Sequence, residues 1–269
     1  MSATVQHLID IVQEIAPDTL AESWDNVGLL VGSGKKTVRG VLLGLDPLSS
    51  LLDEARRLDA NLVITHHPAI FRPLAAILID HIPGRFIRTA ITRDINVIGC
   101  HTNLDATNGG VSDVLAERLG LHHIAPLVRS EESGKEACCG LGRIGDLAQP
   151  LATDAFLARL RTALEPPWLL AAGPRPEQIA RVAVCGGSCS EFAEKALAGG
   201  ADVFVTAEVK HAIARWAEEA GLWIIDGGHF ATENPAMASL GERLRTVLAA
   251  RGHDIAVHVA RQEAPLQTI

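Results

Sequence analysis

Short runs of β-branched and aliphatic residues alternate along this chain with stretches that carry apolar residues at helical spacing. This alternation restricts the fold more than any other feature, because it is typical of βαβ units in which helices connect and cover parallel strands. Apolar residues make up 48% of the 269 residues, which is enough for an ordinary buried core. We therefore predict an α/β fold with mainly parallel central sheets.

The predicted elements fall into two groups along the chain. The strands are expected at Val27–Val31, Val38–Leu45, Asn61–Thr65, Ile95–Cys100, Cys138–Ile144, Arg181–Cys185, Asp202–Thr206, Leu222–Ile225 and Ile255–Val259. The helices are expected at Val5–Ile15, Leu51–Leu58, Arg85–Thr92, Val111–Leu119, Thr153–Leu164 and Pro235–Ala250. A charged stretch, Arg129–Glu136, is predicted to be a linker or surface loop. The chain is accordingly divided into an N-terminal α/β lobe (1–128) and a C-terminal α/β lobe (137–269), which can also interlock as one domain.

Two parts of the chain share the same internal spacing. Leu43 and Thr65 are 22 positions apart, and so are Val184 and Thr206, each pair within a similar pattern of apolar residues. Downstream, His101-x-x-x-Asp105 matches His229-x-x-x-Glu233. This indicates a duplicated unit and two related lobes. Since parallel sheets bind ligands outside the carboxyl ends of their strands, a metal site is predicted in the crevice between the lobes.

His66 and His67 follow one predicted strand directly, and Pro68 comes after them. Neighbouring side chains on a regular strand point to opposite faces, so both histidines can serve one site only where the strand ends. Pro68 predicts such an end. A single histidine in this position is usually a cap or a hydrogen-bonded side chain, whereas two adjacent ones favour metal binding.

His229 and Glu233 follow another predicted strand after two glycines. If both lie in the first turn of a helix, their spacing places them on one face. The alternative is an ordinary helix start in which Thr232 and Glu233 act as cap and dipole compensation. Asp105 is predicted to bind or bridge a metal, and His101 either to bind it or to orient a ligand.

Imidazole and carboxylate ligands suit zinc, manganese or iron better than magnesium. We therefore predict two divalent metal ions per subunit, with Glu233 as the bridging and catalytic carboxylate. Trp24, Asp25 and Asn26 are interpreted as packing and capping residues. Arg72, close to the histidine pair, is interpreted as a solvated arginine that could also contact a phosphate.

Charge and cysteine content exclude several classes of protein. A formal net charge of -8 gives no general electrostatic reason to bind duplex nucleic acid or an anionic bilayer. No apolar run reaches the ~20 residues of a membrane-spanning helix. Five cysteines, an odd number, and the absence of a leader-like N-terminus argue against a disulfide framework and secretion. A cytoplasmic location is therefore expected.

Five motifs in the expected order cover nearly the whole chain: Ser23–Gly32 (SWDNVGLLVG), Thr65–Pro68 (THHP), His101–Asp105 (HTNLD), Val184–Ser188 (VCGGS) and Gly228–Glu233 (GHFATE). Together they closely resemble the GTP cyclohydrolase I type 2 homologues, which are also called NGG-one interacting factor three-like proteins.

The resemblance implies a ligand set and an assembly. A dinuclear centre would be bound by His66, His67, Asp105, His229 and Glu233, with Glu233 contacting both ions. A two-lobed α/β fold would form a ring-shaped homohexamer with the metals facing an internal cavity.

One segment departs from the family pattern. Relatives often carry T-G-E or T-G-D where this chain has Thr206-Ala207-Glu208. Glu208, Lys210 and His211 are therefore assigned, like His101, to the pocket or to contacts with the ligands.

The function implied by the resemblance is a metal-dependent hydrolase of a nucleotide or related small molecule, with opening of the imidazole ring of GTP as its named version. One alternative is a phosphoesterase that uses the same metals. Another is a non-catalytic, metal-stabilised assembly that binds protein or single-stranded nucleic acid.

Overall fold

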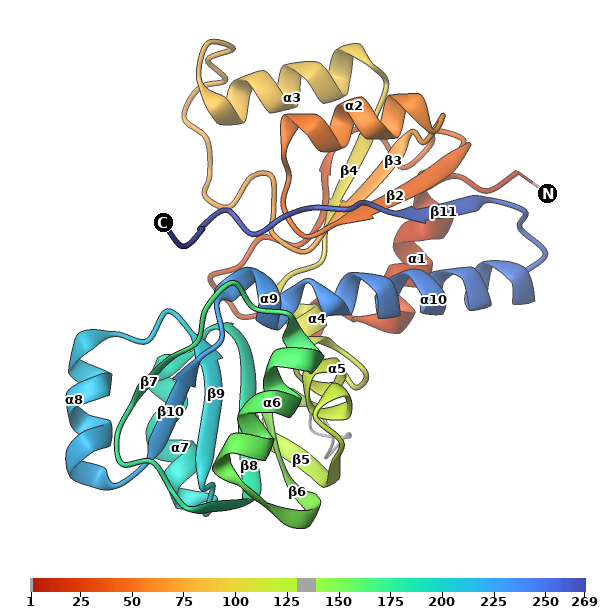
Figure 1. Ribbon diagram of the computed structural model, residues 1–269. Coiled ribbons are helices and arrows are strands. Elements are labelled where there is room, and N and C mark those ends of the chain that lie inside the picture. The colour runs from red at the N-terminus through yellow and green to blue at the C-terminus, as the bar shows by residue number, and fades with distance from the viewer. Residues whose placement is uncertain (1, 130–138) are drawn as a thin grey trace. The chain divides into compact units, whose positions relative to one another are not determined.

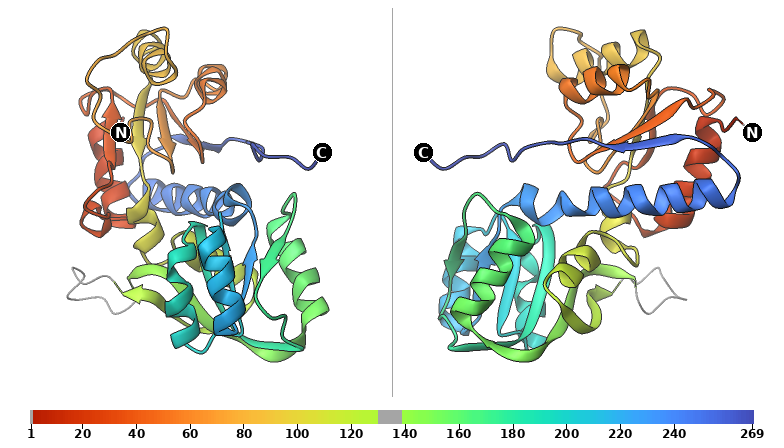
Figure 2. Two further views of the ribbon diagram at one scale, coloured as in Figure 1. Left: turned by 90° about the vertical axis from the view of Figure 1, so that its left-hand side faces the viewer. Right: turned by 45° about the vertical axis from the view of Figure 1, so that its right-hand side comes forward.

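The computed structural model describes residues 2–129 and 139–269 and contains two compact units. Unit 1 comprises Met1–Leu104 and Met237–Gln262, and unit 2 comprises Asp105–Ala236 and Glu263–Ile269. Each unit is a β-sheet covered by helices, so the predicted α/β class is confirmed (Figures 1 and 2).

The units follow a different division of the chain from the predicted domains 1–128 and 137–269. The reason is that β11 (Ala256–Val259), close to the C-terminus, pairs with β2 (Gly40–Gly44) in unit 1. Of the predicted linker, Arg129 ends a strand, and residues 130–136 lie outside the described residues.

Unit 1 contains a five-stranded sheet with the order β1-β4-β3-β2-β11. Besides β2 and β11, its strands are β1 (Gly28–Val31), β3 (Leu62–Thr65) and β4 (Asn96–Gly99). All neighbours in this sheet are parallel except β1, which is antiparallel to β4. The carboxyl ends of β2, β3 and β4 therefore lie along one edge of the sheet.

The helices of unit 1 cover both faces of this sheet (Figure 1). They are α1 (Val5–Ile15), the short η1 (Asp18–Leu20), α2 (Ser49–Arg57), α3 (Ile82–Thr92) and α10 (Pro235–Ala250). Leu52 of α2 and Phe86 of α3 pack on Leu42, Val63 and Val97 of the sheet. The neighbouring strand residues point to the opposite face, which α1 and α10 cover (Figures 1 and 2).

Unit 2 contains a six-stranded mixed sheet with the order β5-β6-β8-β9-β10-β7. Its strands are β5 (Leu121–Arg129), β6 (Gly140–Ala152), β7 (Leu170–Ala172), β8 (Gln178–Ser188), β9 (Val203–Ala207) and β10 (Trp223–Asp226). Only β8, β9 and β10 are mutually parallel; the other pairs are antiparallel. Both sheets thus have a parallel centre.

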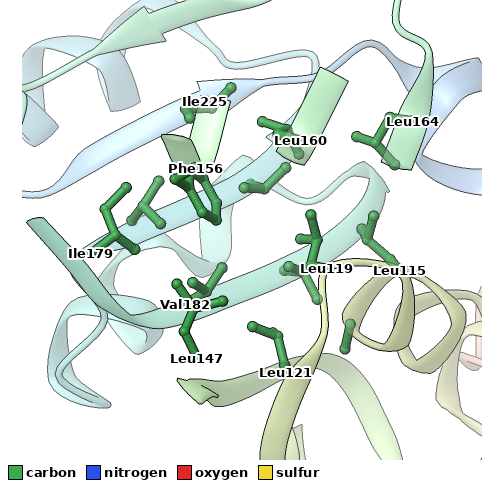
Figure 3. Close-up of a cluster of buried hydrophobic side chains, with 14 of the residues drawn as sticks. Leu115, Leu119, Leu121, Leu147, Phe156, Leu160, Leu164, Ile179, Val182 and Ile225 are labelled. Carbon is green, nitrogen blue, oxygen red and sulfur yellow. The ribbon is translucent and has the colours of Figure 1, made fainter. Parts of the chain in front are cut away.

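Alternating side chains of the central strands of unit 2 build two apolar layers. On one face, Val182 packs against Phe156 and Leu160 of α6 (Thr153–Leu164) and against α5 (Val111–Arg118) (Figure 3). Val203 belongs to the same cluster. On the other face, Ala183 and Phe204 pack against α7 (Ala193–Ala198) and α8 (His211–Ala220). The short η2 (Ser190–Phe192) precedes α7.

The predicted duplication agrees with the sheet topology. Strands β4-β3-β2 and β10-β9-β8 have the same order and are parallel, and an antiparallel strand, β1 or β7, flanks the equivalent edge. Leu43 pairs with Ile64, and Val184 pairs with Val205.

The proposed match of His101 with His229 is displaced by one residue. Gly99 pairs with Thr65, whereas Asp226 pairs with Thr206. His101 consequently precedes α4 (Thr102–Ala106), whereas His229 is the first residue of α9 (His229–Glu233).

Candidate metal centre

Three histidines gather at the carboxyl edge of the unit 1 sheet. His66 and His67 follow the last residue of β3, Thr65, and His101 follows β4 after Cys100. One ring nitrogen from each histidine lies within 4.8 Å of the others, and the ring centroids of His66 and His101 are 5.2 Å apart. β3 therefore ends directly before His66, so that both histidines can face one site. His101 lies close enough to the pair to bind an ion at the same place.

Each of these three rings is oriented through its Nδ1 atom. Nδ1 of His66 lies 3.0 Å from the carbonyl oxygen of Cys100. Nδ1 of His67 lies 2.8 Å from Oδ1 of Asp46, and Nδ1 of His101 lies 2.9 Å from Oδ1 of Asp25. Because carbonyl and carboxylate oxygens accept hydrogen bonds, these contacts assign the proton to Nδ1 and the lone pair to Nε2. This is the orientation that metal-binding histidines have in proteins.

Asp25 is a buried carboxylate whose surroundings favour the charged form. Burial by itself would raise the pKa of this group, but its hydrogen bonds with His101 and Thr102 and the nearby His101 ring outweigh burial and hold the pKa well below its usual value of 3.8. The backbone N–H of Thr102 donates to Asp25 Oδ2 at 3.0 Å. Asp25 therefore fixes His101 and the start of α4 together.

Unit 2 presents a second group of ligand atoms at the carboxyl edge of its own sheet. His229 begins α9, and Nε2 of its ring lies 3.0 Å from Oε2 of Glu233, four residues later. The Nδ1 atom of the same ring lies 2.8 Å from Oε1 of Glu208. Carboxylate oxygens of Asp105 and Glu233 are within 4.8 Å of each other. His229 is thus oriented by a carboxylate in the same way as His67 and His101.

The buried carboxylate of Glu233 fits against glycine. Gly187 has φ +70°, and a Cβ atom added to it would lie 2.1 Å from Glu233 Oε1. The N–H of Gly187 donates to the hydroxyl of Thr232 at 3.0 Å. The Gly186-Gly187 pair near the end of β8 therefore provides room for a carboxylate.

The donor atoms fit divalent metal ions. Ligands at ~2.0–2.2 Å from a common ion lie about 3 Å from each other, which agrees with the His229–Glu233 separation of 3.0 Å. Nitrogen and carboxylate oxygen together suit zinc, manganese or iron. Each unit therefore presents potential metal ligands, as predicted; the number and identity of bound ions belong to the proposal below.

The remaining predicted residues have different surroundings. Glu208 contacts His229, and its own backbone has φ +52°, a conformation that is costly for a non-glycine residue. Lys210 precedes α8, with its Nζ 4.0 Å from Glu191, and His211 is exposed at the first position of that helix. Within the described ranges, neither Lys210 nor His211 belongs to a group of potential metal ligands.

Two contacts of the site were not predicted from the sequence. Asp46 follows β2 and orients His67; its position beside the end of the parallel neighbour β3 is a signal that could have identified it. Trp24, interpreted as a buried packing residue, is 48% exposed, and its ring centroid lies 6.2 Å from that of His101. Arg72, interpreted from the sequence as a solvated arginine, stacks over the exposed ring of Phe71, with its Cζ atom 4.7 Å from the ring centroid.

Comparison with known proteins assigns the chain to a family. Residues 3–265 match the model of the family described as Duf34/NIF3 (NGG1p interacting factor 3). The chain belongs to the Duf34/NIF3 family. The resemblance predicted from the sequence motifs is thereby confirmed.

Curated Duf34/NIF3 relatives share the name GTP cyclohydrolase 1 type 2 homolog. The one from Clostridium acetobutylicum is 31% identical over 261 residues, which cover 97% of each chain. The one from Streptomyces coelicolor is 34% identical over 260 residues, which cover 96% of this chain and 91% of the relative.

Solved structures agree with the Duf34/NIF3 assignment. A hypothetical protein from Staphylococcus aureus has a TM-score of 0.92 at 28% identity, with all of both chains covered. A Bacillus cereus protein related to NIF3 has a TM-score of 0.93 at 24% identity and 99% coverage of each chain, which supports the fold. Among the described residues, no helix has the length and apolar character needed to cross a bilayer.

Proposed function

We propose that this protein is a hydrolase that uses two divalent metal ions to act on a nucleotide or a related small molecule. The proposed ligands are His66, His67, Asp105, His229 and Glu233, with Glu233 shared by both ions. The observation that carries the proposal is the common orientation of the histidines. His66, His67, His101 and His229 each direct Nδ1 to a carbonyl or carboxylate oxygen.

That common orientation favours metal binding over ordinary structural roles. An isolated cap or packing histidine does not require this arrangement, whereas three of the proposed ligands have it, and so does His101 beside the His66–His67 pair. Carboxylate partners raise the basicity of the opposite ring nitrogen and reduce its rotation. Asp25, Asp46 and Glu208 therefore act as positioning residues for the proposed site.

The proposed chemistry is hydrolysis. Bound divalent ions supply Lewis acidity, which activates water and polarises the electrophilic centre of a substrate. Glu233, buried beside Gly187, would hold its carboxylate at a fixed position. The contacts of His229 with Glu208 and Glu233 would hold its ring in a fixed orientation.

The names of the relatives support a nucleotide substrate. GTP cyclohydrolase 1 type 2 homolog is the name of several proteins that match most of this chain. Hydrolytic opening of a purine imidazole ring consumes water at carbon, whereas a phosphoesterase would release phosphate. The products therefore distinguish the two reactions.

We also propose that the protein is a cytoplasmic homohexamer. Support for self-association comes from an exposed apolar stretch before and at the start of α3, where Ile77, Leu78 and Ile82 are 57%, 57% and 77% exposed. Exposed apolar side chains that gather in one segment are typical of interaction sites. Light scattering after size exclusion tests the hexamer, and a monomer at micromolar concentration would contradict it.

The central test combines metal analysis with a nucleotide screen. Protein purified without chelator is expected to contain two divalent ions per chain and to hydrolyse at least one nucleotide. Glu233→Gln is expected to lower metal content and abolish turnover, whereas Glu242→Gln, an exposed residue of α10 paired with Arg245, should change neither. Full turnover by the Glu233 variant, or a metal-free wild type that turns over equally fast, would refute the proposal.

A further inference from the structure

A cavity of about 270 Å³ lies within unit 2 beside His229. The loop before β7, the ends of β9 and β10, the first turn of α9 and the C-terminal segment supply its walls. This volume lies just below the usual range of about 300–1,000 Å³ for small-molecule sites. One of the proposed metal ligands, His229, thus belongs to the wall of a cavity large enough for a single ring system.

The cavity is built to hold a flat apolar body. Trp168 and Phe230 contribute aromatic rings, and Leu170 and Leu266 contribute aliphatic surface. The backbone of Gly228 lies under the Trp168 ring, since a Cβ atom added to Gly228 would be 3.8 Å from Trp168 Cζ2. Rings bound on such surfaces gain most from stacking.

The polar side chains of the cavity wall are mainly hydrogen-bond acceptors. Asp226 and Glu208 present carboxylate oxygens, which accept and do not donate. Asp226 Oδ1 accepts from the backbone N–H of Gly228 and Oδ2 from that of Val209, each at 3.0 Å, and His229 Nδ1 lies 2.8 Å from Glu208 Oε1. Each carboxylate oxygen has a second lone pair that can accept from a ligand. A ligand that fits this wall must therefore bring N–H donors of its own.

Charge also limits what can enter the cavity. No lysine or arginine lines it in the part of the chain that the structure describes, while two carboxylates do. A phosphate group in this position would face acidic side chains without a compensating cation. Any phosphate of a bound nucleotide should accordingly remain outside the cavity.

We propose that this cavity binds the heterocycle of the substrate, and that it selects a planar ring with adjacent N–H donors, such as the N1–H and 2-amino edge of guanine. The ring would stack on Trp168, and the carboxylates of Asp226 and Glu208 would accept from its donor edge. This inference rests on the proposed function for the identity of the substrate, but binding of the heterocycle can be measured without turnover.

Calorimetric titration of the chelator-treated protein with a nucleoside series tests the proposal without catalysis. Guanosine should bind most tightly, inosine less tightly because it lacks the 2-amino group, and 1-methylguanosine and adenosine at least about tenfold more weakly than guanosine. GTP should bind no more tightly than guanosine, because no cation lines the cavity. Equal affinity for adenosine and guanosine, or clearly tighter binding of GTP, would overturn the assignment.

Variants of Trp168 locate the binding site. Trp168→Leu should weaken guanosine binding by roughly tenfold to a hundredfold, because it removes a stacking surface, whereas Trp168→Phe should retain most of the affinity. Thermal unfolding of both variants checks that they are folded. Unchanged guanosine affinity in folded Trp168→Leu would show that the nucleoside binds elsewhere and reject the proposal.

Failure of the cavity assignment and failure of the hydrolase proposal give different results. Selective guanosine binding without hydrolysis of any nucleotide supports the cavity assignment and refutes the hydrolase. Metal-dependent hydrolysis without the predicted nucleoside order supports the hydrolase and refutes the cavity assignment.

Discussion

At the scale of single residues, the candidate site depends on the carboxylate oxygens that orient the histidine rings as much as on the histidines themselves. Asp46, Asp25 and Glu208 each contact the Nδ1 atom of a different ring at 2.8 to 2.9 Å. An imidazole that rotates loses the alignment of its lone pair with an ion. Positioning residues should therefore affect metal affinity without removing a ligand.

Replacement of Asp46 tests this role. Asp46→Ala should weaken metal binding by ~10- to 100-fold, the usual effect of removing a partner of a metal-bound histidine. Competition with a fluorescent chelator measures the affinity. Asp154→Ala, which removes an exposed carboxylate paired with Arg175, is the control and should have wild-type affinity. Wild-type metal affinity in the Asp46 variant would show that metal binding does not depend on the contact between Asp46 and His67.

Gly187 offers a second test at this scale. In Gly187→Ala the new methyl group would meet Glu233 Oε1 at 2.1 Å, at a backbone φ of +70°. Gly221→Ala is a matched control, because Gly221 has φ +82° but no atom within 4 Å of the added Cβ. Both should lose ~1–2 kcal/mol of unfolding free energy through backbone strain, but only Gly187→Ala should also lose metal. Equal metal content in the two variants would contradict the packing of Glu233 against Gly187.

At the scale of elements, a buried ion pair joins α5 to β6 in unit 2. Arg143 Nε and Nη2 each lie 2.6 Å from an oxygen of Asp113, and Nη1 donates to the carbonyl oxygens of Gly140 and Gly142. The Arg143 side chain is 2% exposed and that of Asp113 10%. Such a pair contributes little compared with apolar packing, but the removal of one partner leaves a buried charge.

Arg143→Met should therefore lower the free energy of unfolding by ~3–5 kcal/mol. The double variant Arg143→Met/Asp113→Leu should recover part of that loss, because no lone charge remains. Arg175→Met, at an exposed pair, should cost at most ~1 kcal/mol. Urea denaturation measures all three. A double variant that is less stable than Arg143→Met would show that Asp113 stabilises the fold even without Arg143, and would contradict the explanation by a lone buried charge.

The elements that the sequence did not predict have weak apolar patterns for physical reasons. β5 carries partly exposed residues and a proline because it lies at a sheet edge, and β7 has only three residues. α8 has Ala217 as its one buried residue within the described chain. The buried parallel strands, by contrast, are continuous apolar runs, which made them recognisable.

At the scale of the whole molecule, local patterns in the sequence indicate strand ends and unusual residue pairs, but they do not indicate which distant strands pair. His66 with His67, and His229 with Glu233, follow strong strand signals and are unusual as pairs. The pairing of β11 with β2 is a long-range contact that no local pattern reports. Asp46 stands alone before a proline and resembles an ordinary turn residue, so only the pairing of β2 with β3 indicates that it lies beside His67.

Metal should stabilise the folded protein if the proposed ligands act together. A ligand that binds only the folded state adds RT ln(1 + [L]/Kd), or about 2.7 kcal/mol at a free concentration of 100 times Kd. Calorimetric melting of chelator-treated wild type should therefore show a Tm that rises with added zinc or manganese. His67→Ala and Glu233→Gln, one change in each unit, should each remove most of that rise, while Glu242→Gln should retain it. A full rise in either ligand variant would mean that the stabilising ion binds at other residues, and the proposed ligand set would then be wrong.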